Sequence, residues 1–137
     1  MVFIFIMQKR NIQIGKLWYE KMWNEPNFEI AQEIIHPEYD PTWIFIPKSG
    51  PAQVIHEIKY FRNVFPDLIY QIVDIVATDA EVWIRYKATG TQKGNAWGFE
   101  PTNKPVEFEG VTILYINPDG KIIDRWGSFC FYDILTN

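Results

Sequence analysis

Apolar residues recur at helical spacing through the first part of the chain. A side chain every three or four residues predicts an amphipathic helix over residues 8–24, with apolar positions at Ile12, Leu17, Trp18, Met22 and Trp23. Pro26 ends this helix, and a second helix is predicted over 28–35. The second helix ends before Pro37, because the residue that precedes a proline avoids the helical region.

A short strand and a third helix follow in the pattern. The apolar run over 42–46 predicts the strand. The third helix begins at Pro51, since proline is well tolerated in a first helical turn, and it ends at Pro66. Its apolar face consists of Val54, Ile55, Ile58, Phe61 and Phe65.

The period of the pattern changes to two in the second half of the chain, which indicates strands. They are predicted over 68–78, 81–92, 105–116 and 121–131. The sequence Asn-Pro-Asp-Gly over 117–120 predicts a tight hairpin between the last two. The order ααβαββββ is typical of an α+β protein, with helices on one face of a curved antiparallel sheet.

The third of these strands indicates what lies on the other face of the sheet. One side of the strand starts with Glu107 and Glu109 and then becomes apolar at Val111, Ile113 and Tyr115. A small sheet that is apolar on both faces needs a second cover. We therefore expect a homodimer that packs sheet against sheet.

The apolar N-terminus, residues 1–7, is too short to span a membrane, and no positive charge precedes it as in a signal peptide. It is interpreted as an edge strand, a docked tail, or a segment ahead of a start at Met7. With no longer apolar run and no linker, the pattern predicts one domain over 1–137, without a membrane partner and in the cytoplasm.

The amino-acid composition argues against several kinds of partner and site. Aromatic residues make up 17% of the chain, a high share for so small a core. The net charge of −4 and the scattered basic residues argue against nucleic acid. One cysteine, Cys130, allows no internal disulfide. One Cys and two His without ligand spacing predict no metal site.

Several local motifs occur together in this order of elements, and they cover roughly residues 10–131. They are His36-Pro-Glu-Tyr39, Gly50-Pro51, Arg62-Asn-Val-Phe-Pro-Asp-Leu68, Ala88-Thr-Gly-Thr91, Gly98-Phe-Glu-Pro-Thr-Asn103 with Val106-Glu-Phe108, and Gly120-Lys-Ile-Ile-Asp-Arg-Trp126. Together they resemble the SnoaL-like polyketide cyclases of the nuclear-transport-factor-like superfamily.

The resemblance implies a cone, in which three N-terminal helices pack on a strongly bent mixed or antiparallel sheet around a hydrophobic cavity. It also implies a small apolar or polycyclic carbonyl compound as substrate and no cofactor. In the family, an acidic residue on the last strand moves a proton next to a carbonyl in an aldol closure. A histidine on the preceding strand helps to hold the oxyanion.

The sequence departs from the family at both of these positions. Counted on from the Gly-Lys-Ile motif, the acid falls at Gly127, and the histidine falls at Thr112. The catalytic candidates that remain are Thr112, a hydrogen-bond donor, and Asp124 on the last strand. The side chain of Asp124 should point opposite to position 127, because strand faces alternate, unless a bulge inverts it. Otherwise Asp124 is a surface charge or a partner of Arg125 or Lys121.

The rings have two interpretations. Either they line an open cavity for a flat apolar ligand, or they fill the cone. The ligand-binding candidates are Trp18, Trp23, Tyr39, Trp43, Tyr60, Tyr86, Thr112 and Trp126.

Three functions therefore stay open. The first is a cofactor-independent cyclase or isomerase whose acid–base group is displaced from the family position. The second is a non-catalytic dimer that binds a small hydrophobic molecule. The third is an interaction module with a filled interior.

Overall fold

The structure, a computed structural model, describes residues 2–41 and 48–128. Its helices and strands follow the predicted order, and the predicted strand boundaries agree to within one residue where they are described. The strand expected over 42–46 and the last residues of 121–131 lie outside the described residues. The elements are α1 (Val2–Leu17), a π-helix η1 (Trp18–Trp23), α2 (Glu29–Ile34), α3 (Pro51–Val64), β1 (Ile69–Ala77), β2 (Glu81–Thr91), β3 (Pro105–Ile116) and β4 (Ile122–Ser128).

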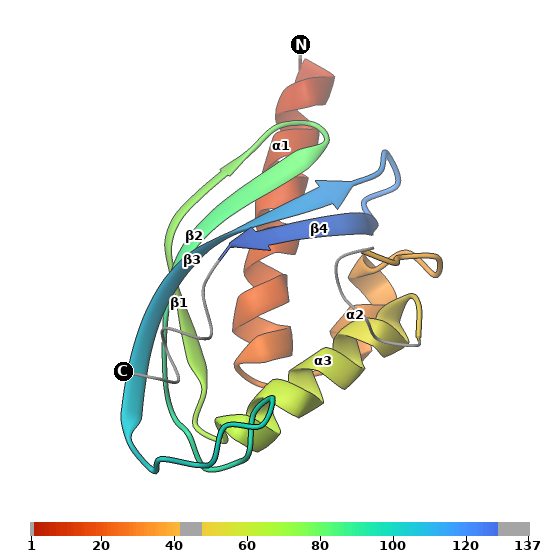
Figure 1. The fold of residues 1–137 in the computed structure, drawn as a ribbon. Coiled ribbons are helices and arrows are strands. Elements are labelled where there is room, and N and C mark those ends of the chain that lie inside the picture. Colours follow the sequence, from red (N-terminus) through yellow and green to blue (C-terminus); the bar gives the residue numbers. More distant parts are fainter. Residues whose placement is uncertain (1, 42–47, 129–137) are drawn as a thin grey trace.

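The four strands form one antiparallel sheet in the order β1-β2-β3-β4. The sheet bends around the helices, which lie on its inner side (Figure 1). A parallel bridge between Ile35 and Ile122 ties the end of α2 to β4. At the β3–β4 hairpin, Gly120 has a φ of 81°, the left-handed conformation that glycine adopts without steric cost. The predicted α+β class is confirmed.

The single helix predicted over 8–24 is two segments. After α1 the helix continues as the wider π-helix η1. There the N–H of Asn24 donates to the carbonyl of Tyr19 at 2.9 Å, a span of five residues. A helix with i to i+5 bonds has more residues in each turn than an α-helix. Four of its six residues are thereby buried: Trp18, Tyr19, Met22 and Trp23. Packing of these bulky side chains on one side of the chain is the reason for the departure.

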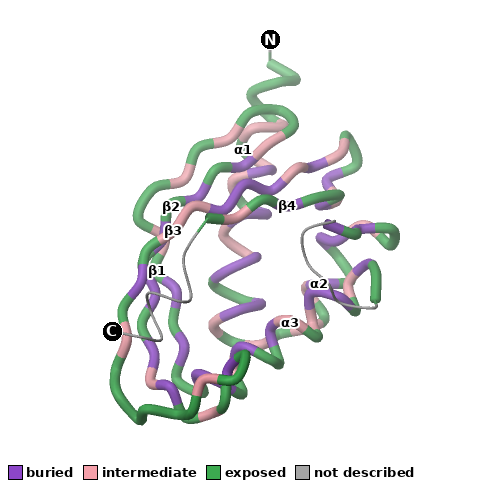
Figure 2. The backbone as a smooth tube through the Cα atoms, in the orientation of Figure 1, coloured by how far each residue is buried: buried purple, intermediate pink, exposed green. Residues whose placement is uncertain are grey.

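The N-terminal residues extend α1 rather than forming an edge strand or a docked tail. The helix begins at Val2, and the large apolar side chains over 2–6 are exposed. This end of α1 extends past the sheet in Figure 1 and is exposed in Figure 2. A helix satisfies its backbone through bonds four residues apart, so these residues need no strand partner. Within the described part of the chain, no helix is both long and apolar enough to cross a bilayer.

The outer face of the sheet carries an apolar row. Trp83 pairs with Val76 on one side and with Ile113 on the other, and Ile113 pairs in turn with Trp126. The exposed fractions are 63% for Val76 and 46% for each tryptophan. The sequence placed Trp126 around the cone, and the structure corrects this. Strand alternation turns Arg125 inward and Trp126 outward.

Gly15 sets how closely α1 approaches the sheet. A Cβ atom at this position would lie 2.8 Å from Cγ1 of Val82 and 2.9 Å from Cδ1 of Ile75. Carbon atoms do not approach this closely, so a larger residue at 15 must displace these side chains or the helix. Glycine here permits the contact that buries the inner rings.

Gly15→Val is expected to lower the free energy of unfolding by about 1–3 kcal/mol, the usual effect of overpacking a core. Urea denaturation followed by circular dichroism measures it. Gln13→Val, an exposed position in the same helix, serves as the matched control and should change stability far less. Equal losses in the two variants would contradict the close contact.

Candidate functional site

A buried ion pair joins the sheet to α3 inside the fold. Nη2 of Arg125, on β4, lies 2.6 Å from Oε2 and 2.7 Å from Oε1 of Glu57, on α3. The side chains of Arg125 and Glu57 are only 5% and 12% exposed. Two opposite charges this close and this buried hold β4 and α3 at a fixed separation, because separating them would leave a charge without its partner.

The ion pair rests on an aromatic ring. The guanidinium carbon of Arg125 lies 5.0 Å from the ring centre of Trp18, within range of a cation–π interaction. Burial alone would lower the pKa of the Arg125 guanidinium, but the Glu57 carboxylate raises it, and the net shift is upward. Arg125 therefore stays positively charged at every pH at which the protein is folded.

A second polar contact lies beside Gly127, on the neighbouring strand β3. The hydroxyl oxygens of Tyr19 and Thr112 are 2.7 Å apart and buried. Thr112 is paired across the β3–β4 ladder with Gly127. Burial raises the pKa of Tyr19 to about 12, so its hydroxyl keeps its proton and remains a donor. Thr112 thus holds a hydroxyl pair next to Gly127.

Gly127 leaves room on the inner face. Among the described residues, a Cβ atom at this position would meet only the carbonyl oxygen of Val111, at 3.8 Å. At Gly110, by contrast, a Cβ atom would lie 2.5 Å from the hydroxyl oxygen of Tyr86. The inner surface therefore has room for a side chain at 127, whereas a side chain at Gly110 would clash with Tyr86.

Several buried polar atoms have no hydrogen-bond partner among the described residues; they include Nε1 of Trp23, the hydroxyl of Tyr39 and Oε1 of Gln53. The side chain of Trp18, by contrast, hydrogen-bonds Tyr19 and acts to lower that residue's pKa. A buried polar group that is left unpaired costs about 1–3 kcal/mol, so a water or a ligand that pairs with it stabilises the fold. Burial raises the pKa of Tyr39, and the charges of Arg125 and Glu57 act on it as well. The Tyr39 hydroxyl is therefore a donor available to a polar ligand.

The structure brings together five of the side chains that the sequence proposed for ligand binding. They are buried on the inner side of the sheet: Trp18, Trp23, Tyr39, Tyr86 and Thr112. Tyr60 and Trp126 are placed elsewhere, and Trp43 lies outside the described residues. Tyr60 is 37% exposed, and its hydroxyl accepts the N–H of Trp97 at 3.2 Å.

Asp124, the acidic candidate from the sequence, lies on the outer face and is exposed. Its Oδ1 accepts the backbone N–H of Arg125 at 2.8 Å. The side chains expected to pair with it have other partners. Arg125 pairs with Glu57, and Lys121 donates to the carbonyl of Glu33. Asp124 and Thr112 are thus on opposite faces of the sheet.

Sequence reasoning missed Glu57 and Arg125 as site residues. Two signals could have found them. Arg125 is two residues from Gly127, the position where the resemblance implies the family's acid, so strand alternation puts both on the same face. Glu57 lies one helical turn after the buried Gln53 and one before the buried Phe61, so the inner face of α3 includes a carboxylate.

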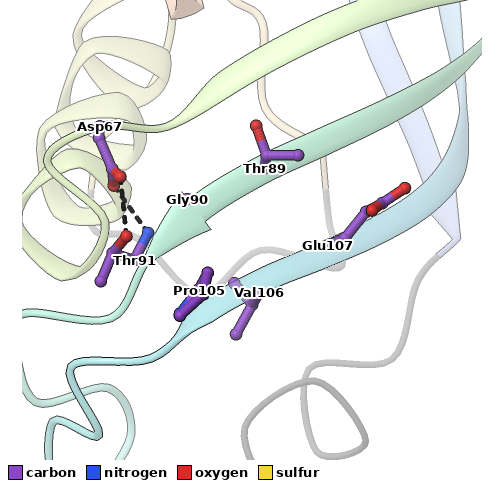
Figure 3. Close-up of a pocket in the computed structure, with 7 residues that line it drawn as sticks. All are labelled: Asp67, Thr89, Gly90, Thr91, Pro105, Val106 and Glu107. Atoms are coloured by element: carbon purple, nitrogen blue, oxygen red, sulfur yellow. Dashed lines mark hydrogen bonds between the residues drawn. The ribbon is translucent and has the colours of Figure 1, made fainter.

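A separate pocket of about 340 Å³ lies at the far end of the sheet, where β2 ends and β3 begins. Figure 3 shows Asp67 directed at Thr91 there. Its carboxylate accepts the backbone N–H of Thr91 at 2.7 Å and the hydroxyl at 2.8 Å. The backbone bond is the main reason why the pKa of Asp67 is lowered. Asp67 therefore stabilises the end of β2 through Thr91 and lies apart from the Arg125–Glu57 ion pair. No cluster of three or more metal-ligating residues occurs among the described residues.

These features define an α+β protein whose helices close the inner face of a bent antiparallel sheet around aromatic and polar side chains. The chain belongs to the SnoaL-like polyketide cyclase family, because the family's sequence profile matches residues 14–136. This confirms the family resemblance seen in the sequence. No curated protein matches the chain.

Solved structures of similar fold agree. A proposed SnoaL-like polyketide cyclase from Jannaschia sp. CCS1 has a TM-score of 0.83 at 19% identity, covering 95% of this chain and 92% of that one. A proposed polyketide cyclase from Acidithiobacillus ferrooxidans has a TM-score of 0.76 at 22% identity, covering 93% and 92%. IdmH from Streptomyces antibioticus, also a proposed polyketide cyclase, has a TM-score of 0.74 at 22% identity, covering 93% and 96%. At these identities the likeness shows the fold.

Glu57→Gln is expected to lower the free energy of unfolding by about 3–5 kcal/mol, because it removes the carboxylate that neutralises the buried charge of Arg125. The double variant Glu57→Leu with Arg125→Met should recover more than half of that loss, since it removes both charges and keeps the volume. Urea denaturation measures both variants. A double variant as unstable as the single one would show that the ion pair is not what holds β4 against α3.

Proposed function

We propose that the protein binds a small, largely apolar compound with a carbonyl group between the helices and the sheet. The observation that carries this is the fully buried hydroxyl of Tyr39, which has no hydrogen-bond partner among the described residues and on which the charges of Arg125 and Glu57 act. A ligand carbonyl oxygen supplies the missing acceptor.

The surrounding rings suit a flat ligand. The ring of Tyr19 stacks on Tyr70 with centres 4.5 Å apart and lies 5.4 Å from Tyr86. Trp23 meets Tyr70 edge-on at 5.3 Å. Aromatic faces and edges offer favourable contacts to a polycyclic compound. The opposite charges of Arg125 and Glu57 cancel, so the polar end of this site favours a neutral ligand over an anion.

The family and the names of its structural relatives support a polyketide-like ligand, and the chain's own residues limit the chemistry. The family's acid position is glycine here, Asp124 lies on the outer face, and Thr112 donates a hydrogen bond but is not a base. The aldol closure of the family is therefore not proposed by its usual route. A non-catalytic dimer that binds the same compounds remains the alternative.

Binding is tested by isothermal calorimetry with a panel of neutral anthraquinones and steroid ketones. At least one compound is expected to bind, and Tyr39→Phe is expected to weaken it about 5- to 10-fold, the effect of one lost hydrogen bond of about 1–1.5 kcal/mol. Tyr60→Phe, the same change at an exposed tyrosine outside the cluster, should leave affinity unchanged. No binding anywhere in the panel would contradict the proposed function and favour a filled interior.

We also propose that the protein is a homodimer that packs through the outer face of the sheet. The row of Val76, Trp83, Ile113 and Trp126 spans all four strands. Val76 and the two tryptophans are exposed, and Ile113 is buried between its neighbours. Charged side chains border the row, including the Asp74–Arg85 pair at 2.7 Å. An apolar centre with a charged rim is typical of a protein interface.

Light scattering at micromolar concentration should give twice the chain mass of 16.2 kDa. Trp126→Lys is expected to yield monomers, because it places a charge within the apolar row. Gln71→Lys, an exposed outward position on β1 away from the row, should remain dimeric. A monomeric wild type would rule the interface out.

A further inference from the structure

Glu57 brings a carboxylate into the layer of the fold from which the family's acid is missing. Arg125 and Gly127 point to the same side of β4, two residues apart, which is about 7 Å along a strand. Because Arg125 binds the Glu57 carboxylate at 2.6–2.7 Å, the carboxylate lies in the same inner layer as position 127. The acid enters from α3 rather than from the last strand.

The groups around Glu57 can hold a developing negative charge. Tyr39 is fully buried, and its hydroxyl has no hydrogen-bond partner among the described residues. The charges of Arg125 and Glu57 both act on this hydroxyl. A fixed, buried donor stabilises an oxyanion far better than a donor in solution. The arrangement thus combines a carboxylate with one available donor.

We infer that Glu57 is the general acid–base of a proton transfer at the carbon next to the ligand's carbonyl, with the Tyr39 hydroxyl as the donor to the carbonyl oxygen. This inference rests on the proposed function. It assigns a catalytic residue that lies outside the family's acid position, and it makes the reaction an enolisation.

In the first step, the carbon–hydrogen bond next to the carbonyl breaks and its proton goes to an oxygen of Glu57. The electron pair of that bond forms a carbon–carbon double bond, and the π pair of the carbonyl moves to oxygen. The oxyanion accepts a hydrogen bond from Tyr39. In the return step, protonated Glu57 gives a proton back to carbon and the carbonyl re-forms. No oxidant, reductant or second substrate is consumed.

The alternative role for the Arg125–Glu57 pair is purely structural. Exchange of the ligand's hydrogen for deuterium from the solvent distinguishes a catalytic role from a structural one. In D₂O, protonated Glu57 can exchange its proton with solvent, since its side chain is 12% exposed. It then returns deuterium to the carbon. A structural ion pair would hold the helix and strand together but would not accelerate this exchange.

The probe is 2-tetralone, a neutral bicyclic ketone with acidic hydrogens next to its carbonyl. Deuterium incorporation is followed by proton NMR in D₂O, and binding is measured in parallel by calorimetry. The wild type is expected to exchange the probe at least 10-fold faster than buffer. Tyr39→Phe should slow the enzymatic part about 10- to 100-fold, somewhat below the full effect of an oxyanion-hole donor.

Two variants remove the base in different ways. Glu57→Gln keeps the size of the side chain, and Glu57→Leu with Arg125→Met removes the base without leaving an unpaired charge, in case the single variant does not fold. Both should bring exchange down to the buffer rate. Glu109→Gln, an exposed carboxylate on the outer face, should exchange like the wild type.

The outcomes separate this inference from the proposed function. If 2-tetralone binds but the wild type exchanges it no faster than the double variant, Glu57 is not a base and the binding function stands. Loss of exchange in Asp124→Asn with activity kept in the double variant would overturn the assignment in favour of Asp124. If neither 2-tetralone nor the ketone panel binds, the proposed function and the role of Glu57 both fall.

Discussion

The buried contact between Arg125 and Glu57 is the constraint on which the inner structure depends. It joins the last described strand to α3, so it fixes the distance between the sheet and the helix that closes it. Burying two charges is unfavourable unless they are paired closely. Here Arg125 has the carboxylate on one side and the ring of Trp18 on the other. The same contact places a titratable group inside an otherwise aromatic interior, so stability and possible chemistry share one pair of residues.

Aromatic side chains and backbone geometry are matched around that pair. The π-helix turns Trp18, Tyr19 and Trp23 to one side of the chain, where an α-helix would have spread them over a wider arc. Gly15 lets the helix approach the sheet closely enough for these rings to be covered. The high aromatic content is therefore divided between two surfaces. One set of rings surrounds the inner polar groups, and a second set, which includes Trp126, forms the outer face of the sheet.

Position 127, where the family resemblance implies an acid, is a glycine in this sequence. The inner face of β4 presents an arginine at 125 and open space at 127. The carboxylate of Glu57 comes from another element, α3. A scaffold that fixes many side chains around one interior can move a charged group from a strand to a helix, because both elements face the same space.

Periodicity in the sequence determined the α+β class, the strand boundaries and the hairpin at Gly120, since hydrophobic spacing and turn residues act locally. Motif order determined the family, and strand alternation already separated Asp124 from position 127. The sequence did not reveal the partner of Arg125, because Glu57 is 68 residues away along the chain. Only the bend of the sheet and the path of α3 bring the two side chains together. The π-helix and the outward position of Trp126 were also decided by tertiary packing. Side chains that are distant in sequence meet only when the whole core forms.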